Sequence, residues 1–194
     1  MTDAPTVGEA WAPVPRPAVT ARASVATAAA MRLLGKRLAG LLRRGDLVVL
    51  GGGLGAGKTT LAAGIGDGLD VRGPVTSPTF VIARMHPSLS GGPDLVHADA
   101  YRLGSRLEVD DLDLDADLDH AVTVVEWGEG LVENLASGHL CVTIDRPGSP
   151  PASGSVPREA LSDESHDEVR RVTAVGYGAR WEAAAGQLHA VLAE

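Results

Sequence analysis

The feature that most constrains this chain is a glycine-rich stretch that fits the pattern G-x-x-x-x-G-K-[ST]. The glycines allow the backbone to curl so that successive N–H groups point inward and form an anion-binding nest. The positive end of a following helix points to the same place. In such a loop the lysine reaches the β- and γ-phosphates of a nucleotide, and the threonine hydroxyl ligates Mg²⁺. The stretch consists of Gly52, Gly53, Leu54, Gly55, Ala56, Gly57, Lys58 and Thr59.

The residues on either side place this loop between a strand and a helix. Residues 46–50 form a short apolar run typical of a buried parallel strand, and residues 59–66 have the pattern of the first turns of a helix. The chain has only two lysines, Lys36 and Lys58, and otherwise uses arginine. A compact ammonium group therefore stands where phosphate binding needs one. The alternative interpretation is a flexible loop that contains a lysine and a threonine by chance.

Length and charge restrict the classes of function. A chain of 194 residues predicts a single α/β domain. The net charge of −8 argues against a protein that binds nucleic acid by itself, because that binding needs clustered Lys and Arg. The single cysteine, Cys141, excludes an internal disulfide. No apolar run is long enough to span a bilayer, and the N-terminus lacks a signal pattern. We therefore expect a cytoplasmic protein without membrane association.

Two segments are expected to lie outside the folded core. Residues 1–18 include four prolines and predict a disordered N-terminal segment. Residues 19–194 predict one domain, with a disordered insertion at about 145–168 that is rich in Pro, Gly, Ser and charge. Further apolar patterns predict strands at 19–25, 81–83, 94–103, 121–125, 139–144 and 171–175, and helices at 27–42, 131–135 and 180–192.

A stiff loop with two hydroxyl side chains precedes the predicted strand at 81–83. Ser77 and Thr79 flank Pro78, which holds the residue before it in an extended conformation. Taken alone, this segment is a turn. Close to a phosphate-binding loop, the same hydroxyls are candidates for a switch that senses the γ-phosphate and its metal ion.

Two of the predicted strands end in carboxylates. Asp99 lies near the end of one apolar run, and Glu126 directly follows the β-branched run 121–125, the form of a Walker B element. Such a carboxylate can hold Mg²⁺ or polarise the attacking water. For Asp99 the alternative is a helix cap or a turn residue. The acidic run 108–119 is interpreted as a solvated face with a few buried leucines, and a partner-binding surface is its alternative.

These motifs occur together in a specific order. The glycine-rich loop is followed by Ser-Pro-Thr-Phe at 77–80, His-x-Asp-x-Tyr-Arg-Leu at 97–103 and Val-Glu-Trp-Gly-Glu at 125–129. With these motifs, the sequence from about residue 27 to residue 181 resembles the TsaE family (formerly called YjeE), and it looks closest to the actinobacterial members. The family consists of small bacterial P-loop ATPases needed to make N6-threonylcarbamoyladenosine in tRNA. The resemblance implies a three-layer α/β sandwich whose central sheet is mostly parallel, with antiparallel edge strands.

The resemblance also implies roles for individual residues. Lys58, Asp99 and Glu126 would be catalytic, and which carboxylate orients the attacking water is left open. Thr59 would hold Mg²⁺ together with the same two carboxylates. The family usually has an acidic residue at the position of Gly53, and this chain departs from the family there. The implied ATP-binding residues are Gly52, Gly53, Leu54, Gly55, Ala56, Gly57, Lys58, Thr59, Thr60, Ser77, Thr79 and Trp127.

Members of this family work with two other proteins, TsaB and TsaD, of which TsaD transfers the threonylcarbamoyl group. For this chain the resemblance implies that ATP binds at the interface with that pair and that hydrolysis resets the complex between catalytic cycles. Contact with tRNA would be indirect, through the complex.

Three other functions remain as alternatives. A P-loop kinase acting on a small molecule would need an acceptor pocket and an arginine-rich lid, and neither is recognisable in the sequence. A GTPase commonly recognises guanine with Asn-Lys-x-Asp, whereas the only asparagine here, Asn134, is followed by Leu135. A nucleotide-dependent scaffold without catalysis is the third alternative, and the two acidic strand ends argue against it.

Overall fold

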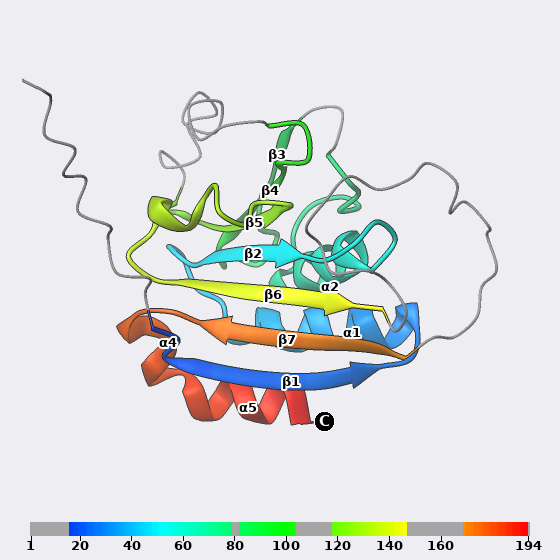
Figure 1. The fold of residues 1–194 in the computed structure, drawn as a ribbon. Coiled ribbons are helices and arrows are strands. Elements are labelled where there is room, and N and C mark those ends of the chain that lie inside the picture. Colours follow the sequence, from blue (N-terminus) through cyan, green and yellow to red (C-terminus); the bar gives the residue numbers. More distant parts are fainter. Residues whose placement is uncertain (1–15, 79–81, 104–117, 147–168, 194) are drawn as a thin grey trace, which may run out of the picture.

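A mixed seven-stranded sheet lies at the centre of the protein (Figure 1). The structure, a computed structural model, describes residues 16–78, 82–103, 118–146 and 169–193. The central strands β6, β2, β5 and β4 are parallel, while β3 at one edge and β7 and β1 at the other pair in antiparallel fashion. In spatial order, the strands are β1 (Val19–Val25), β7 (Arg170–Gly176), β6 (His139–Asp145), β2 (Leu47–Gly51), β5 (Ala121–Glu126), β4 (Asp94–Asp99) and β3 (Ala83–His86).

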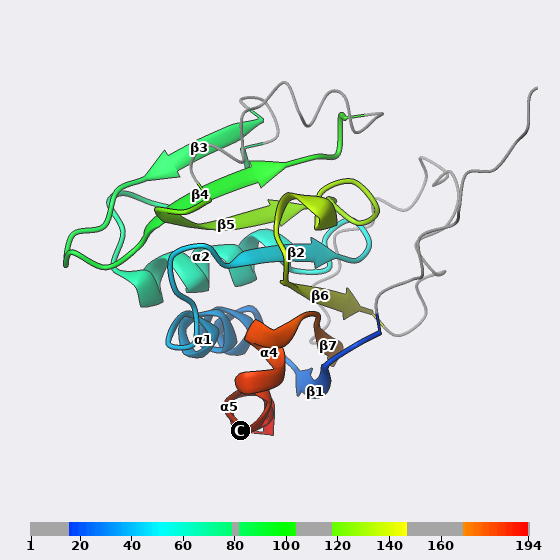
Figure 2. The same cartoon turned by 90° about the vertical axis from the view of Figure 1, so that its left-hand side faces the viewer.

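Most helices of the described residues cover one face of this sheet. They are α1 (Ala28–Ala39), α2 (Lys58–Leu69), α4 (Ala179–Ala183) and α5 (Ala185–Ala193). A short 3-10 helix, η1 (Glu133–Leu135), follows β5. Figure 2 shows α1, α2 and α5 on the same side of the strands. Alternate residues of β2 separate the two faces: Val48 and Leu50 join the core under the helices, and Leu47 and Val49 join a smaller apolar cluster on the other face.

Helices α1 and α2 approach each other closely because glycines form their contact. A Cβ atom at Gly35 of α1 would overlap the carbonyl oxygen of Leu61, and one at Gly64 of α2 would overlap the carbonyl oxygen of Arg32. The side chain of Met31 on α1 lies against Gly57, the residue that precedes α2. Helix α1 therefore supports the helix that begins at the glycine-rich loop.

The predicted α/β class, with parallel central strands and antiparallel edges, is confirmed, and residues 19–25 form an edge strand as expected. The helix predicted at 27–42 is capped by the Thr27 side chain but ends at Ala39, with Gly40 as its C-cap, so its predicted end was wrong. The single helix predicted at 180–192 is two helices, because the backbone leaves the helical conformation at Ala184.

Other sequence predictions fall partly or wholly outside the described residues. These are most of the N-terminal segment 1–18, most of the acidic run 108–119, and the insertion at 145–168 apart from its first two residues. Of the strand predicted at 81–83, Val81 is outside the described residues. Ile82 has a φ of +71° and precedes β3, so the strand starts later than expected.

Candidate functional site

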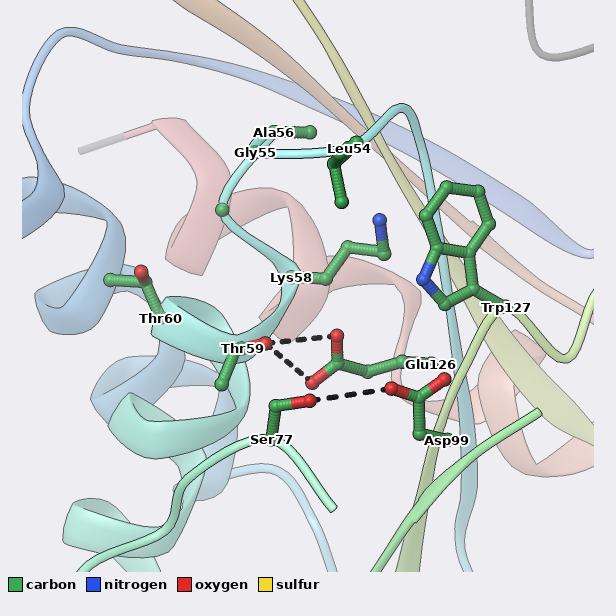
Figure 3. A pocket seen from close by; sticks show the side chains of 11 residues that line it. Leu54, Gly55, Ala56, Lys58, Thr59, Thr60, Ser77, Asp99, Glu126 and Trp127 are labelled. Carbon is green, nitrogen blue, oxygen red and sulfur yellow. Dashed lines mark hydrogen bonds between the residues drawn. The ribbon is translucent and has the colours of Figure 1, made fainter. Parts of the chain in front are cut away.

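A pocket of about 240 Å³ lies at the carboxyl end of the parallel strands, where the loop between β2 and α2 faces the ends of β4 and β5 (Figure 3). Ligands of open α/β sheets bind at this end of the strands. The pocket is lined by Leu54, Gly55, Ala56, Gly57, Lys58, Thr59, Thr60, Ser77, Asp99, Glu126 and Trp127.

The loop that lines the pocket depends on glycine at defined positions. Gly52 and Gly57 have φ values of +121° and +116°, and residues with a side chain rarely adopt such values. A Cβ at Gly52 would also overlap the carbonyl oxygen of Ile144 on β6. Helix α2 begins directly after this loop, and no side chain caps its first N–H groups. The loop therefore presents the positive end of a helix to the pocket.

Lys58 is buried at the start of α2, and its ammonium group is held by the loop itself. Nζ donates to the carbonyl oxygens of Gly52 at 2.8 Å and Gly53 at 3.0 Å, and it lies 3.6 Å from the centroid of the Trp127 ring. Burial lowers the pKa of Lys58, while the negative charges of Glu126, Asp99 and Glu129 act against this shift. The Lys58 ammonium group is therefore surrounded by carboxylates and by carbonyl oxygens of the loop.

Thr59 and Glu126 are joined across the pocket. The Thr59 hydroxyl lies 2.8 Å from Oε1 and 3.0 Å from Oε2 of Glu126, and donates its proton to this carboxylate (Figure 3). Glu126 is only 3% exposed. Because the hydroxyl proton points to the carboxylate, the lone pairs of the Thr59 oxygen remain available to a metal ion or a hydrogen-bond donor.

Asp99 lies beside Glu126, because the two residues are paired in the parallel register of β4 and β5. The Asp99 carboxylate accepts a hydrogen bond from the Ser77 hydroxyl at 3.3 Å and from the backbone N–H of Tyr101 at 3.0 Å. Asp99 is 5% exposed. The structure thus brings both predicted strand-end carboxylates to one pocket and adds the Ser77 hydroxyl of the predicted switch. Thr79, the other predicted hydroxyl, lies outside the described residues.

Trp127 turns the chain out of β5 directly after Glu126. Its φ is +60°, in the left-handed region, and its N–H donates to the carbonyl oxygen of Leu50 at 3.0 Å. The indole ring lies over Lys58 and is 5.3 Å from the ring of Tyr101, an exposed residue. One wall of the pocket is therefore aromatic.

Two of the residues predicted to bind ATP lie outside the lining of the pocket. Gly52 and Gly53 do not line the pocket, although their carbonyl oxygens hold Lys58. A Cβ at Gly53 would have no atom within 4 Å, so this position has room for the acidic side chain that the family usually carries.

Sequence reasoning did not assign two residues that the structure places at the site. The His97 ring on β4 contacts Glu126, with Nε2 2.9 Å from Oε1. The Glu129 carboxylate lies against Gly51, where β2 ends. Its pKa is raised by burial and by Glu133, and Lys58 opposes this shift. For His97 a signal was available in the sequence. His97 and Asp99 are two residues apart on one strand, so their side chains lie on the same face of the sheet.

The donor set around Thr59 suits a hard cation that arrives with other oxygen ligands. Hydroxyl and carboxylate oxygens are the ligands that Mg²⁺ prefers, and Mg²⁺ usually keeps substrate phosphates and water in its coordination shell. Among residues 16–78, 82–103, 118–146 and 169–193, no group of three or more His, Cys, Asp or Glu side chains could hold a metal ion. Within the same part of the chain, no helix is long and apolar enough to cross a membrane.

Comparisons with known proteins agree on one family. The model of the family described as "Threonylcarbamoyl adenosine biosynthesis protein TsaE" matches residues 25–150. A tRNA threonylcarbamoyladenosine biosynthesis protein TsaE from Streptomyces coelicolor is 59% identical over 155 residues, which are 79% of this chain and 95% of the relative. The protein of the same name from Mycobacterium tuberculosis is 57% identical over 120 residues, 58% of this chain and 71% of the relative.

The fold also matches a solved structure. The crystal structure of YdiB from Bacillus subtilis superimposes with a TM-score of 0.64 at 26% sequence identity, and the match covers 89% of this chain and 93% of YdiB. A TsaE protein from the same organism is 32% identical to this chain over 152 residues, 78% of this chain and 82% of the relative.

Proposed function

The chain belongs to the TsaE family of tRNA threonylcarbamoyladenosine biosynthesis proteins, and from this premise we propose that it binds and hydrolyses ATP for that modification. Hydrolysis would be coupled to turnover of a TsaB–TsaD complex. The single observation that supports the proposal best is the convergence of Lys58, Thr59, Asp99 and Glu126 on one pocket at the carboxyl ends of the parallel strands.

The phosphates of ATP would bind at the start of α2. The curled loop, the uncapped N–H groups and the Lys58 ammonium offer donors and positive charge to an anion. In this structure Lys58 donates to the carbonyl oxygens of Gly52 and Gly53, and we propose that it also contacts the β- and γ-phosphates. The Trp127 ring, whose centroid is 3.6 Å from Nζ of Lys58, would form a wall beside the bound phosphates.

Mg²⁺ fits the residues present, because Thr59 and Glu126 supply a hydroxyl and a carboxylate that are already hydrogen-bonded to each other. We propose that these two residues hold the metal ion, and Asp99 lies next to them on the neighbouring strand. When bound, Mg²⁺ would neutralise charge on the phosphate oxygens.

We further propose that Asp99 orients the attacking water. Glu126 is engaged by Thr59 and His97, whereas Asp99 accepts a hydrogen bond from Ser77 in the loop that leads to Thr79. Ser77 and Thr79 would sense the γ-phosphate, so that loop position and hydrolysis are linked. The chemistry of this chain would be ATP hydrolysis alone, and tRNA would be held by the partners, in keeping with the net charge of −8.

The proposal is tested by phosphate release from ATP without any added acceptor, compared with GTP. The two lysines of the chain provide a matched pair of variants. Lys58→Ala should lower phosphate release roughly 100-fold or more, because one preorganised electrostatic contact to the transferred group is lost. Lys36→Ala, in the last turn of α1, should leave the rate unchanged.

Unchanged turnover in Lys58→Ala would contradict the assignment. ATP consumption that requires a small-molecule acceptor would indicate a kinase, and a preference for GTP would indicate a GTPase.

A further inference from the structure

We propose that His97 is a positioning residue that holds the Glu126 carboxylate in the orientation needed to bind a nucleotide-associated divalent cation. This inference rests on the proposed function, because it gives His97 a task at the Mg²⁺–ATP site. His97 does not line the pocket, so it acts through Glu126 and not on the nucleotide.

The contact between the two side chains is fully enclosed. His97 is 0% exposed and Glu126 is 3% exposed, and Nε2 lies 2.9 Å from Oε1. The two residues come from neighbouring parallel strands, β4 and β5. A hydrogen bond to a carboxylate at this distance is charge-assisted and about twice as strong as one between neutral groups. The Glu126 side chain is therefore held by His97 as well as by Thr59.

The direction of this hydrogen bond fixes the tautomer of His97. An ionised carboxylate can only accept, so Nε2 must carry the proton. Nδ1 is buried and has no hydrogen-bond partner among the described residues. The geometry thus assigns Nε2 as the ring nitrogen that donates to Glu126.

The two oxygens of Glu126 are consequently not equivalent. Oε1 receives both the His97 N–H at 2.9 Å and the Thr59 hydroxyl at 2.8 Å, while Oε2 contacts the Thr59 hydroxyl at 3.0 Å. With Oε1 engaged, Oε2 is the oxygen left for a cation beside Thr59. Without His97 the carboxylate could rotate about its terminal bond, and the Thr59 hydroxyl would lose its fixed acceptor.

Two substitutions separate this positioning role from a structural one. In His97→Gln the amide nitrogen can reach the place of Nε2 and donate to Glu126. In His97→Asn the amide nitrogen reaches only the place of Nδ1, so the polarity is similar but the hydrogen bond is lost. The unfolding midpoint of each variant shows whether it folds.

The decisive readout is the affinity for ADP and for a non-hydrolysable ATP analogue, measured with Mg²⁺ and in EDTA. We expect His97→Asn to lose roughly 10-fold or more of the gain in affinity that Mg²⁺ provides, as is typical when a residue that orients a metal ligand is removed. His97→Gln should retain most of that gain, and the affinity in EDTA should change little in either variant. Equal Mg²⁺ dependence in His97→Asn and wild type, or an equal loss in both variants, would overturn the inference.

A second measurement needs no nucleotide and keeps the inference testable if His97→Asn fails to fold. Nitrogen-15 NMR of the wild-type protein should show His97 with a proton on Nε2, and this proton should shift in Glu126→Gln. A ring without a proton on Nε2 would overturn the inference. Wild-type protein that binds nucleotide without any response to Mg²⁺ would instead contradict the metal assignment in the proposed function, and the tautomer would still decide whether His97 holds Glu126.

Discussion

Helix α2 takes part in two regions that are both buried but are held together by different forces. Along its side, Gly64 meets the backbone of α1 so closely that there is no space for a Cβ. At its N-terminal end, Lys58 and Thr59 contact loop carbonyls and the Glu126 carboxylate through hydrogen bonds. The first contact depends on shape and the second on charge and donor geometry. Changes along the side should therefore affect folding, and changes at the end should affect chemistry.

The largest expected effect is at the N-terminal end. Thr59→Val keeps the shape of the side chain but removes the hydroxyl that contacts Glu126. We expect Mg²⁺-dependent phosphate release to fall roughly 100-fold, the scale of losing one preorganised polar contact. Thr59→Ser, which keeps the hydroxyl, should retain most of the activity. Loss of activity in both variants would show that the hydroxyl is not what matters at this position.

The next effect tests the side of the helix. Gly64→Ala places a methyl group on the carbonyl oxygen of Arg32, so the helices must separate. Urea unfolding should show a loss of about 1–3 kcal/mol in the free energy of unfolding, as for other overpacked cores. Gly186→Ala in α5 is the control, because a Cβ there meets no atom within 4 Å. This variant should be neutral or slightly stabilised by the higher helix propensity of alanine. Equal effects of the two substitutions would contradict the close α1–α2 contact.

A smaller effect comes from a titratable group away from the pocket. His139 on β6 is buried and stacks on Tyr177, with ring centroids 4.8 Å apart. Burial lowers the pKa of His139 below 6.5, and Glu133 only partly opposes this shift. The unfolded chain therefore binds a proton more readily, and the stabilising difference is present above about pH 6.5 and lost as the pH falls through the lowered pKa.

Thermal unfolding from pH 7.5 to pH 5 checks this sign. His139→Phe keeps an aromatic ring against Tyr177 and should show a weaker loss of stability at low pH than the wild type. An identical pH dependence in both proteins would contradict the direction of the pKa shift.

The smallest expected effect is at Glu129, whose raised pKa shows that its negative charge is disfavoured in the fold. Stability should therefore decrease as the pH rises from about 4.5 through the raised pKa, and Glu129→Gln should remove that part of the decrease. Although the Glu129 carboxylate lies against Gly51, the residue as a whole is exposed, so solvent screening keeps the change in stability small. Removing a negative charge near Lys58 should also slightly strengthen ADP binding. Weaker binding by this variant would show that the carboxylate helps to hold the nucleotide or its metal ion.

The parts that sequence predicted best are those fixed by local patterns. The order of strand, glycine-rich loop and helix, and the position of Glu126 at a strand end, follow from short runs of residues, and the structure places these features around one pocket. The strand predicted at 94–103 was wrong in its end, because β4 stops at Asp99. The functional roles of these residues, of Thr79 and of the partner proteins stay predictions.

The parts that sequence missed depend on contacts between distant residues. The bond between His97 and Glu126 joins positions 29 residues apart and requires the register of β4 and β5, which no local pattern specifies. The break at Ala184 lies within a run of three alanines, and Gly186 comes only after the second helix has begun. The break follows Trp181, which is fully buried against the core, so tertiary packing accounts for this turn better than local propensity does.

The most direct test of the account is phosphate release from ATP by the pure protein, alone and together with TsaB and TsaD from the same organism, with Lys58→Ala as the control. We expect strong stimulation by the pair, which is lost in Lys58→Ala. Hydrolysis that is indifferent to the pair would contradict the coupling and leave a P-loop nucleotide hydrolase that acts with another partner.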